Sequence, residues 1–320
     1  FSPSRVPCTS LRSTNTYGSV HRKFADERRQ ETEPGYTRTM QVVVRSVHVY
    51  PVKSLRGIDL DAATLTPLGL EHDRAWLLVD AQGLFMSQRR LAAMARIGTR
   101  ITPERLELSA KDHETLHIPL RTPDGPQLKA RVWEDECVVL DEGNEAARWF
   151  ASALGLEPGP RLVRMAPGFR REQKRPERYG AETTTFFADT APLLIANQAS
   201  LDALNITLER RGHTPVPMNR FRANLVVEGL SAFTEHAVRG LEGQRYRLGL
   251  RYPRERCVMT TMDQETGDRD PSGQPFAVLR EINPMPDNPK GPAFGELAVI
   301  ESGEGATVRR GDRLDVLGTE

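Results

Sequence analysis

The sequence predicts a β-rich α+β fold built from two modules, and three observations predict it. Short segments of alternating polarity recur about every ten residues, which is typical of barrels and sandwiches. Stretches with helical periodicity are few. The chain of 320 residues is long enough for two hydrophobic cores at roughly 150 residues per domain. We expect a disordered leader or tail over 1–39, a barrel-like module over 40–158 and a second barrel domain over 159–320.

In the first module, alternating valines predict the opening strand, which ends at Tyr50-Pro51. Turn residues at Asp80–Gly83 and Pro123–Gly125 separate later segments. A helix over 144–154 closes the module, because its apolar residues have helical spacing and Gly155 follows as a C-terminal cap. Strands are expected at 42–49, 58–66, 75–79, 97–101, 106–108, 115–118, 128–132 and 137–140.

The second module mixes strands with two helices. The helices are expected at 200–211 and 276–282. Seven bases and two acids fall in 161–178, which we interpret as a solvated linker, with guidance of an anionic cofactor or an acidic redox partner as the alternative. The acidic, Gly-containing stretch 263–273 predicts an exposed loop. Strands are expected at 193–196, 224–227, 246–250, 296–300 and 313–317.

Composition excludes several classes of protein. The formal net charge is +1, so the chain lacks the global field that would grip nucleic acid as a polymer. No apolar run approaches the ~18 residues of a membrane span. Three scattered cysteines, Cys8, Cys137 and Cys257, supply neither a disulfide framework nor the four thiolates of a ferredoxin cluster. We therefore expect a protein of a reducing compartment, in the first place the cytoplasm.

The first 39 residues differ from the rest of the chain. They are rich in Ser and Thr, and no acid precedes Asp26. A mitochondrial transit peptide has this composition, although an Arg-bearing helical face is missing. Met40 directly precedes the first predicted strand, so the segment is equally interpreted as a disordered tail or as sequence upstream of the true start.

The run His113-Glu114-Thr115-Leu116-His117 matches the HExxH pattern of zinc proteases. That chemistry requires both histidines on one face of a helix. Here Pro119 follows closely and the apolar residues alternate, which predicts a strand. In a strand the two histidines would lie about 13 Å apart at ~3.3 Å per residue, too far to share one zinc. A zinc hydrolase stays a minor alternative, in which His113→Ala would abolish activity.

Cys257 is the chemically distinctive residue of the sequence. Guanidinium groups near a thiol lower its pKa and favour the thiolate, which is both a nucleophile and a ligand for soft metals. The setting of Cys257 is basic and rich in Thr, whereas Cys137 is flanked by Val and Leu and predicts a buried, structural thiol. Four bases precede Cys257 closely: Arg245, Arg251, Arg254 and Arg256.

The run Arg-Cys-Val-Met-Thr-Thr-Met-Asp over 256–263, followed by Thr266-Gly267, resembles the signature of the MOSC-domain proteins that include the mitochondrial amidoxime-reducing component and its bacterial relatives. The similarity extends over most of 41–317, and the MOSC N-terminal β-barrel module is included in it. The other matching segments, in chain order, are Tyr50–Ser54 with Gly57, His72–Val79, Phe187–Pro192, Phe221–Asn224 and Phe294-Gly295.

The resemblance implies a cofactor, Mo-molybdopterin, with Cys257 as the metal ligand and a catalytic residue. A soft thiolate suits a metal that is already held by dithiolene sulfur. Because the pterin carries a phosphate, the site needs convergent cations and hydroxyl groups. The residues expected to supply them are Lys53, Ser54, Arg74, Arg222 and Arg256. The residues expected to hydrogen-bond the pterin edges are Asp189, Thr190, Asn224, Thr260 and Thr261.

Asp263 is a second candidate catalytic residue, with three open interpretations. It could orient Arg256, deliver protons to the metal centre, or cap a turn, and the turn has as much weight as the other two together.

The resemblance also implies the activity: a molybdenum-dependent oxidoreductase that reduces small N-hydroxylated compounds such as amidoximes, hydroxylamines and hydroxylated bases. The electrons would come from a separate ferredoxin, flavin reductase or b-type cytochrome. The alternative is a sulfurase-like protein that carries the cofactor or transfers sulfur without turning over a substrate.

Overall fold

The computed structural model describes residues 40–122 and 125–319. The predicted leader, Cys8 and positions 123–124 of the predicted turn lie outside these residues. Among the described residues, no helix combines the length and apolarity needed to cross a membrane.

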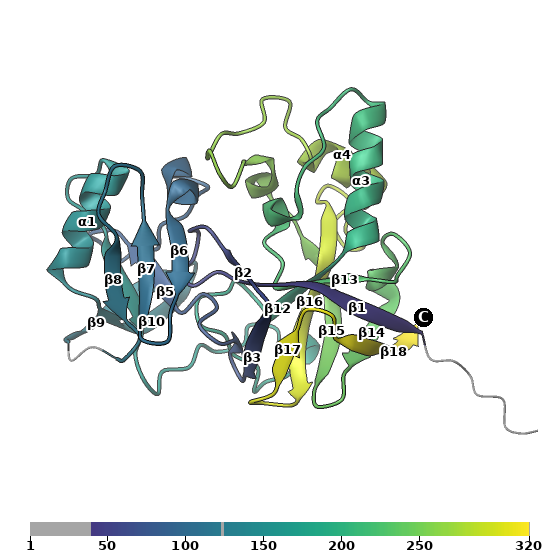
Figure 1. Cartoon of the computed structure of the whole chain (residues 1–320), viewed down its shortest axis with the longest axis horizontal. Helices are drawn as coiled ribbons and strands as arrows, with labels where there is room; N and C mark the ends of the chain where they lie inside the picture. Colours follow the sequence, from purple (N-terminus) through teal and green to yellow (C-terminus); the bar gives the residue numbers. More distant parts are fainter. Residues whose placement is uncertain (1–39, 123–124, 320) are drawn as a thin grey trace, which may run out of the picture. The chain divides into compact units, whose positions relative to one another are not determined.

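Within the described chain, seven strands form a closed barrel in the order β13-β12-β16-β15-β14-β18-β1, and β1 pairs with β13 to close it (Figure 1). The β12–β13 pair is parallel, and the other neighbours are antiparallel. Strand β2 (Ile58–Leu60) pairs with the last three residues of β1, Val47–Val49. The barrel strands are β1 (Gln41–Val49), β12 (Leu193–Asn197), β13 (Leu225–Glu228), β14 (Val238–Glu242), β15 (Arg247–Glu255), β16 (Ala293–Ser302) and β18 (Arg313–Thr319).

The alternation predicted for β1 places its valines in the barrel core. Val42, Val44 and Val47 are fully buried and pack against inward-facing residues of β12, β13 and β18. A three-stranded sheet of β17 (Thr307–Arg309), β3 (Ala62–Thr66) and β4 (Gly69–Leu70) contributes to the same core. The alternation is interrupted once, by a register shift between Val44 and Ser46, and on either side of it a slip of one residue would turn the buried valines to the outer face.

The remaining strands form two further sheets beside α1 (Asn144–Leu154). Phe150 and Leu154 of α1 pack on Leu106 and Leu162, which come from different sheets. Gly155 adopts a left-handed conformation with φ of 64°, as expected for a glycine after a helix. The four-stranded sheet has the order β5 (Trp76–Val79), β11 (Arg161–Met165), β10 (Asp135–Asp141) and β9 (Gln127–Val132); the other is β6 (Gly98–Ile101), β7 (Arg105–Ser109) and β8 (Leu116–Pro119).

Short helices connect and cover the barrel strands. The longest, α3 (Gln198–Arg210), begins where the Asn197 side chain accepts a hydrogen bond from the Ala199 amide at 3.2 Å. It packs with α4 (Phe276–Ile282) over the outer face of β12, β13 and β16. The others are α2 (Pro176–Tyr179) and the 3₁₀ turns η1 (Ala92–Arg96), η2 (Met218–Phe221), η3 (Thr234–Ala237) and η4 (Val258–Thr261).

The predicted β-rich α+β class is confirmed, as are the helices at α1, α3 and α4. The predicted strand over 58–66 is divided into β2 and β3. The chain also crosses between modules more than once, since β1 belongs to the closed barrel whereas β11 pairs with β5 and β10. The domain limits proposed from the sequence stay a prediction.

The interpretation of 161–178 as a solvated linker is wrong at its start. Residues 161–165 form β11, the strand between β5 and β10, and Leu162 and Val163 are fully buried. The bases there are paired with carboxylates: Arg164 is buried and pairs with Glu142, and Arg161 is partly exposed and pairs with Asp141. A basic residue in the sequence does not indicate a solvent-exposed side chain when a neighbouring strand supplies a carboxylate that pairs with it.

The HExxH residues lie where the strand prediction places them. His117 belongs to β8, and His113 lies in the preceding turn, where its Nδ1 is 2.7 Å from the Lys111 carbonyl oxygen. Its ring packs edge-on against Trp149. Within 40–122 and 125–319, no group of three or more His, Cys, Asp or Glu side chains is arranged to hold a metal ion.

A buried acid–base pair lies on β16. Glu296 is 2% exposed, and its Oε1 is 2.5 Å from Nδ1 of His236. Burial raises the pKa of Glu296 to about 7. Burial opposes protonation of His236, but its hydrogen bond to Glu296 and the nearby Glu235 raise the pKa of the imidazole above its ordinary value. The folded protein therefore binds more protons here than the unfolded chain.

We expect the free energy of unfolding to fall as pH rises from about 4.5 through 7, because both pKa values are higher in the folded state. Glu296→Gln removes the larger titration and should reduce this loss, which is on the order of 2 kcal/mol. Urea unfolding at pH 5 and pH 8 measures it. Glu301→Gln, at a surface pair with Arg247, is the control. A wild-type pH dependence in Glu296→Gln would contradict the assignment.

Candidate cofactor pocket

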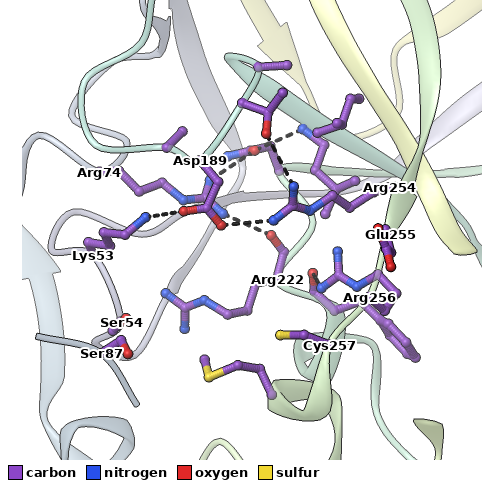
Figure 2. Close-up of a pocket in the computed structure, with 18 of the residues that line it drawn as sticks. Lys53, Ser54, Arg74, Ser87, Asp189, Arg222, Arg254, Glu255, Arg256 and Cys257 are labelled. Atoms are coloured by element: carbon purple, nitrogen blue, oxygen red, sulfur yellow. Dashed lines mark hydrogen bonds and ion pairs between the residues drawn. The ribbon is translucent and has the colours of Figure 1, made fainter. Parts of the chain in front are cut away.

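A cavity of about 390 Å³ is lined by segments of both modules (Figure 2). The lining combines cations, hydroxyl groups and one thiol. Nine of the twelve site residues expected from the sequence line it: Lys53, Ser54, Arg74, Asp189, Thr190, Arg222, Asn224, Arg256 and Cys257.

Tyr50 supports two of the arginines. Its buried ring lies 4.4 Å from the Arg74 guanidinium and 4.3 Å from that of Arg222, so both cations contact the aromatic face. Its hydroxyl donates to the Ala223 carbonyl oxygen at 3.1 Å, and burial raises its pKa to about 12. Gly57 makes room for the ring, because a Cβ there would lie 2.4 Å from a ring carbon. The presence of Gly57 together with Tyr50 in the matching segment thus has a steric reason.

Asp189 binds two of the cationic side chains that line the cavity. Figure 2 shows Lys53 and Arg254 converging on its carboxylate from opposite sides, at 2.5 Å and 2.8 Å. Lys53 also donates to the Phe187 carbonyl oxygen, and burial lowers the pKa of its ammonium group. Burial opposes ionisation of Asp189, but the two cations dominate and hold its pKa far below the ordinary range. Asp189 is therefore an ionised positioning group and a poor proton donor.

Arg74 and Arg222 are fixed by their backbones as well as by hydrogen bonds. Both have positive φ, 49° and 54°, a conformation that costs a non-glycine residue roughly 1–2 kcal/mol. Arg74 donates to the Asn224 side-chain oxygen at 3.0 Å and to the Arg222 carbonyl oxygen at 3.1 Å. Arg222 donates to the Leu55 carbonyl oxygen at 2.8 Å. Burial lowers the pKa of Arg222 to about 10, because keeping the guanidinium charged inside the protein costs free energy.

Arg256 places a buried guanidinium in the wall of the cavity. Its Nη2 donates to the Phe221 carbonyl oxygen at 2.8 Å, but its buried Nε has no hydrogen-bond partner. Burial and the neighbouring Arg254 charge lower its pKa to about 9. Buried donors are almost always satisfied in folded proteins. A cavity lined by Arg256 and by the two cations on Tyr50 fits an anionic group such as the phosphate of a pterin cofactor.

Cys257 follows β15 and begins η4, so its thiol is held at the end of a barrel strand. It is partly buried, and its Sγ accepts a hydrogen bond from Arg89 Nη2 at 3.4 Å. Of the four bases that precede it, Arg254 and Arg256 line the cavity. Arg251 instead pairs with Glu301, and Arg245 is not among the lining residues.

Three expected site residues lie outside the cavity lining. The Thr260 hydroxyl donates to the Cys257 carbonyl oxygen at 3.1 Å, and the Thr261 hydroxyl donates to that of Val258 at 2.7 Å, so both stabilise η4. Asp263 accepts from two backbone amides of the following turn, which lower its pKa, and it pairs with Arg220 at 3.2 Å. The turn-capping interpretation describes this geometry. Cofactor and catalytic roles for the three stay predictions.

The sequence reasoning missed the lining residues of the first module after Ser54 and Arg74. Phe85, Ser87 and Arg89 come from the segment after β5, and Trp133 comes from the turn between β9 and β10. None belongs to a periodic pattern. One signal was available, a large aromatic residue between the predicted strands at 128–132 and 137–140.

Two family models match the chain: the MOSC N-terminal beta barrel domain over residues 41–157 and the MOSC domain over 182–315. Mitochondrial amidoxime-reducing component 1 of Homo sapiens is 30% identical over 286 residues, covering 86% of this chain and 83% of that protein. The Mus musculus protein of the same name is 29% identical and covers 90% of this chain and 87% of its own length.

Molybdenum cofactor sulfurase of Drosophila melanogaster is 28% identical over 78% of this chain, which spans only 32% of that protein. Among solved structures, the YUAD protein of Bacillus subtilis covers 88% of the chain with a TM-score of 0.42 and 10% identity. Both modules are matched by family models, and the human relative is aligned over most of both chains. The chain therefore belongs to the MOSC-domain family that includes the mitochondrial amidoxime-reducing components.

Proposed function

We propose that this chain is a molybdenum-cofactor oxidoreductase that reduces N-hydroxylated compounds such as amidoximes, hydroxylamines and hydroxylated bases. The observation that carries the proposal is a cation-rich cavity, lined by Arg74, Arg222 and Arg256, that also contains the Cys257 thiol. Homology to the amidoxime-reducing components supports an enzyme role.

Each residue type in the cavity has a task in holding Mo-molybdopterin. Cys257 would supply the soft protein ligand for the metal. Arg222 and Arg256 would neutralise the phosphate, since guanidinium groups suit phosphate oxygens and here lack carboxylate partners of their own. Ser54, Thr190 and Asn224 offer hydrogen-bonding groups to the polar edges of the pterin. The bound cofactor would supply the two-electron redox chemistry that side chains lack.

The chain's own residues orient these groups. Asp189 stays ionised and holds Lys53 and Arg254 in place, so protons for the reduction of an N–O bond would come from elsewhere. Asp263 stays a proposed proton donor, although its pKa is lowered by two backbone amides. A neutral hydroxyl-bearing substrate would approach through the side of the cavity lined by Arg89 and Trp133.

We propose that electrons arrive from a separate ferredoxin, flavin reductase or b-type cytochrome, because three cysteines cannot hold an iron–sulfur cluster with four thiolate ligands. A cytoplasmic location, or a mitochondrial one if residues 1–39 act as a transit peptide, stays a prediction.

A second candidate is a carrier of the cofactor or of sulfur, favoured by the similarity to molybdenum cofactor sulfurases. One preparation separates the two. We expect purified protein to contain near-stoichiometric molybdenum and pterin, and to consume hydroxylamine when a chemical reductant is added. Bound molybdenum without reductant-driven loss of hydroxylamine would support the carrier. Zinc in place of molybdenum would contradict both candidates.

A further inference from the structure

Trp133 occupies a backbone position that suits glycine. It is the first of two residues, Trp133 and Glu134, that connect β9 to β10, and its φ is 59°. In two-residue hairpins, positions with positive φ are normally taken by Gly, Asn or Asp. A bulky residue there is a genuine outlier, and such strain concentrates at functional sites. An indole therefore occupies a position whose backbone conformation favours glycine.

Burial does not explain the indole. Trp133 is 46% exposed, among the few large apolar residues of the described chain that face solvent to this extent. It nevertheless lines the cofactor cavity. Its Nε1 donates to Asp189 Oδ1 at 3.1 Å, and its ring meets the edge of Phe85 at 4.7 Å between centroids. These contacts fix the orientation of the ring while leaving much of its surface free.

The indole also lies close to the thiol. The Arg89 guanidinium is 5.2 Å from the centre of the Trp133 ring, and its Nη2 is 3.4 Å from Cys257 Sγ. Sulfur and indole are thus separated by no more than about 10 Å, given a C–N bond of about 1.3 Å. The bound places Trp133 near enough to Cys257 for a one-ring substrate to contact both, beside the Arg89 guanidinium that already contacts the two groups.

We propose that Trp133 determines substrate specificity by stacking its exposed indole on planar, conjugated N-hydroxylated compounds. This inference rests on the proposed reductase function. Stacking on an aromatic side chain tolerates many ring systems, because each presents a π face. Small aliphatic substrates have no such face and gain nothing from the indole. Trp133 thus favours aromatic amidoximes and hydroxylated bases over hydroxylamine.

The variant Trp133→Gly tests the proposal without threatening the fold, since glycine relieves the positive φ. We expect the ratio of kcat/KM for benzamidoxime to kcat/KM for hydroxylamine to fall about tenfold relative to wild type, chiefly through a higher KM for benzamidoxime. Trp133→Phe should retain most of the preference for benzamidoxime. Trp149→Leu, a partly exposed tryptophan on α1 outside the cavity, is the matched control.

Two outcomes would overturn the proposal. An equal loss for both substrates in Trp133→Gly would mean that the indole acts through Asp189 on the cofactor site. Unchanged kinetics for both would mean that it has no role in specificity. If wild type reduces neither substrate, the proposed function fails, and binding then tests the inference alone: benzamidoxime should quench tryptophan fluorescence in wild type but not in Trp133→Gly. Absence of that difference would also overturn it.

Discussion

Cys257→Ser is expected to lower reductase activity at least about 100-fold while the protein stays folded. A hydroxyl occupies nearly the same volume and can accept the Arg89 hydrogen bond, but it is a poor ligand for a soft metal. Loss of groups that merely support metal ligands commonly costs 10–100-fold, so loss of the ligand itself should cost more. The measurements are the molybdenum-to-protein ratio, the rate of benzamidoxime reduction and the thermal unfolding midpoint of each purified protein.

Cys137→Ser is the matched control for this substitution. Cys137 is 1% exposed in the core of the four-stranded sheet and lies outside the cavity. Its serine variant should unfold more easily, because a hydroxyl replaces an apolar sulfur, yet it should retain molybdenum and activity per folded molecule. Wild-type activity in Cys257→Ser would remove the basis of the proposed function.

Local patterns predicted most of the fold because local chemistry determines it. The apolar spacing of α1 and the glycine that ends it are contained in one short segment, as is the alternation of β1. β11 escaped prediction because its arginines are neutralised by Asp141 and Glu142, which lie some twenty residues earlier in the chain. Whether a base is solvated or buried thus depends on tertiary partners that no window of sequence contains.

The same distinction applies to the cavity. Residues in recognisable motifs, such as Lys53 and Cys257, were identified because the motif carries the cavity's chemistry. Arg89 and Trp133 were missed because tertiary folding alone brings them near Cys257. Thr260 and Thr261 show the opposite error, because they were expected at the site but do not line the cavity. They belong to the same motif as Cys257, and their hydroxyls donate to backbone carbonyl oxygens at η4. Proximity in sequence indicates a shared turn, and only the fold decides which side chains face the cavity.

Arg254 and Arg256 differ in their partners, and this difference leads to a second prediction with a large effect. Both line the cavity, but Arg254 pairs with Asp189 at 2.8 Å, whereas Arg256 has a buried Nε without a partner and a lowered pKa. An unsatisfied buried polar group costs about 1–3 kcal/mol. At neutral pH Arg256 is protonated, so the folded protein without cofactor bears this cost.

We therefore expect opposite effects from two chemically identical substitutions. Arg256→Gln should raise the unfolding free energy of cofactor-free protein by about 1 kcal/mol, since an amide can still donate to a carbonyl without burying charge. It should also lower retained molybdenum at least about tenfold, because a charge-assisted contact to phosphate is lost. Arg254→Gln should destabilise the cofactor-free protein, because Asp189 loses one of its two cations. Urea unfolding after cofactor removal, with metal analysis before it, measures both.

Stability should thus rise and retention of the cofactor should fall at position 256, whereas stability should fall at position 254. A residue that serves only the fold cannot give the first pattern, because removing it would cost stability. If Arg256→Gln destabilised the cofactor-free protein as much as Arg254→Gln, the unpartnered nitrogen would be a packing feature, and the case for an anionic group beside Cys257 would be weakened. The buried charge of Arg256 is explained if a bound anion offsets the free energy that its desolvation costs.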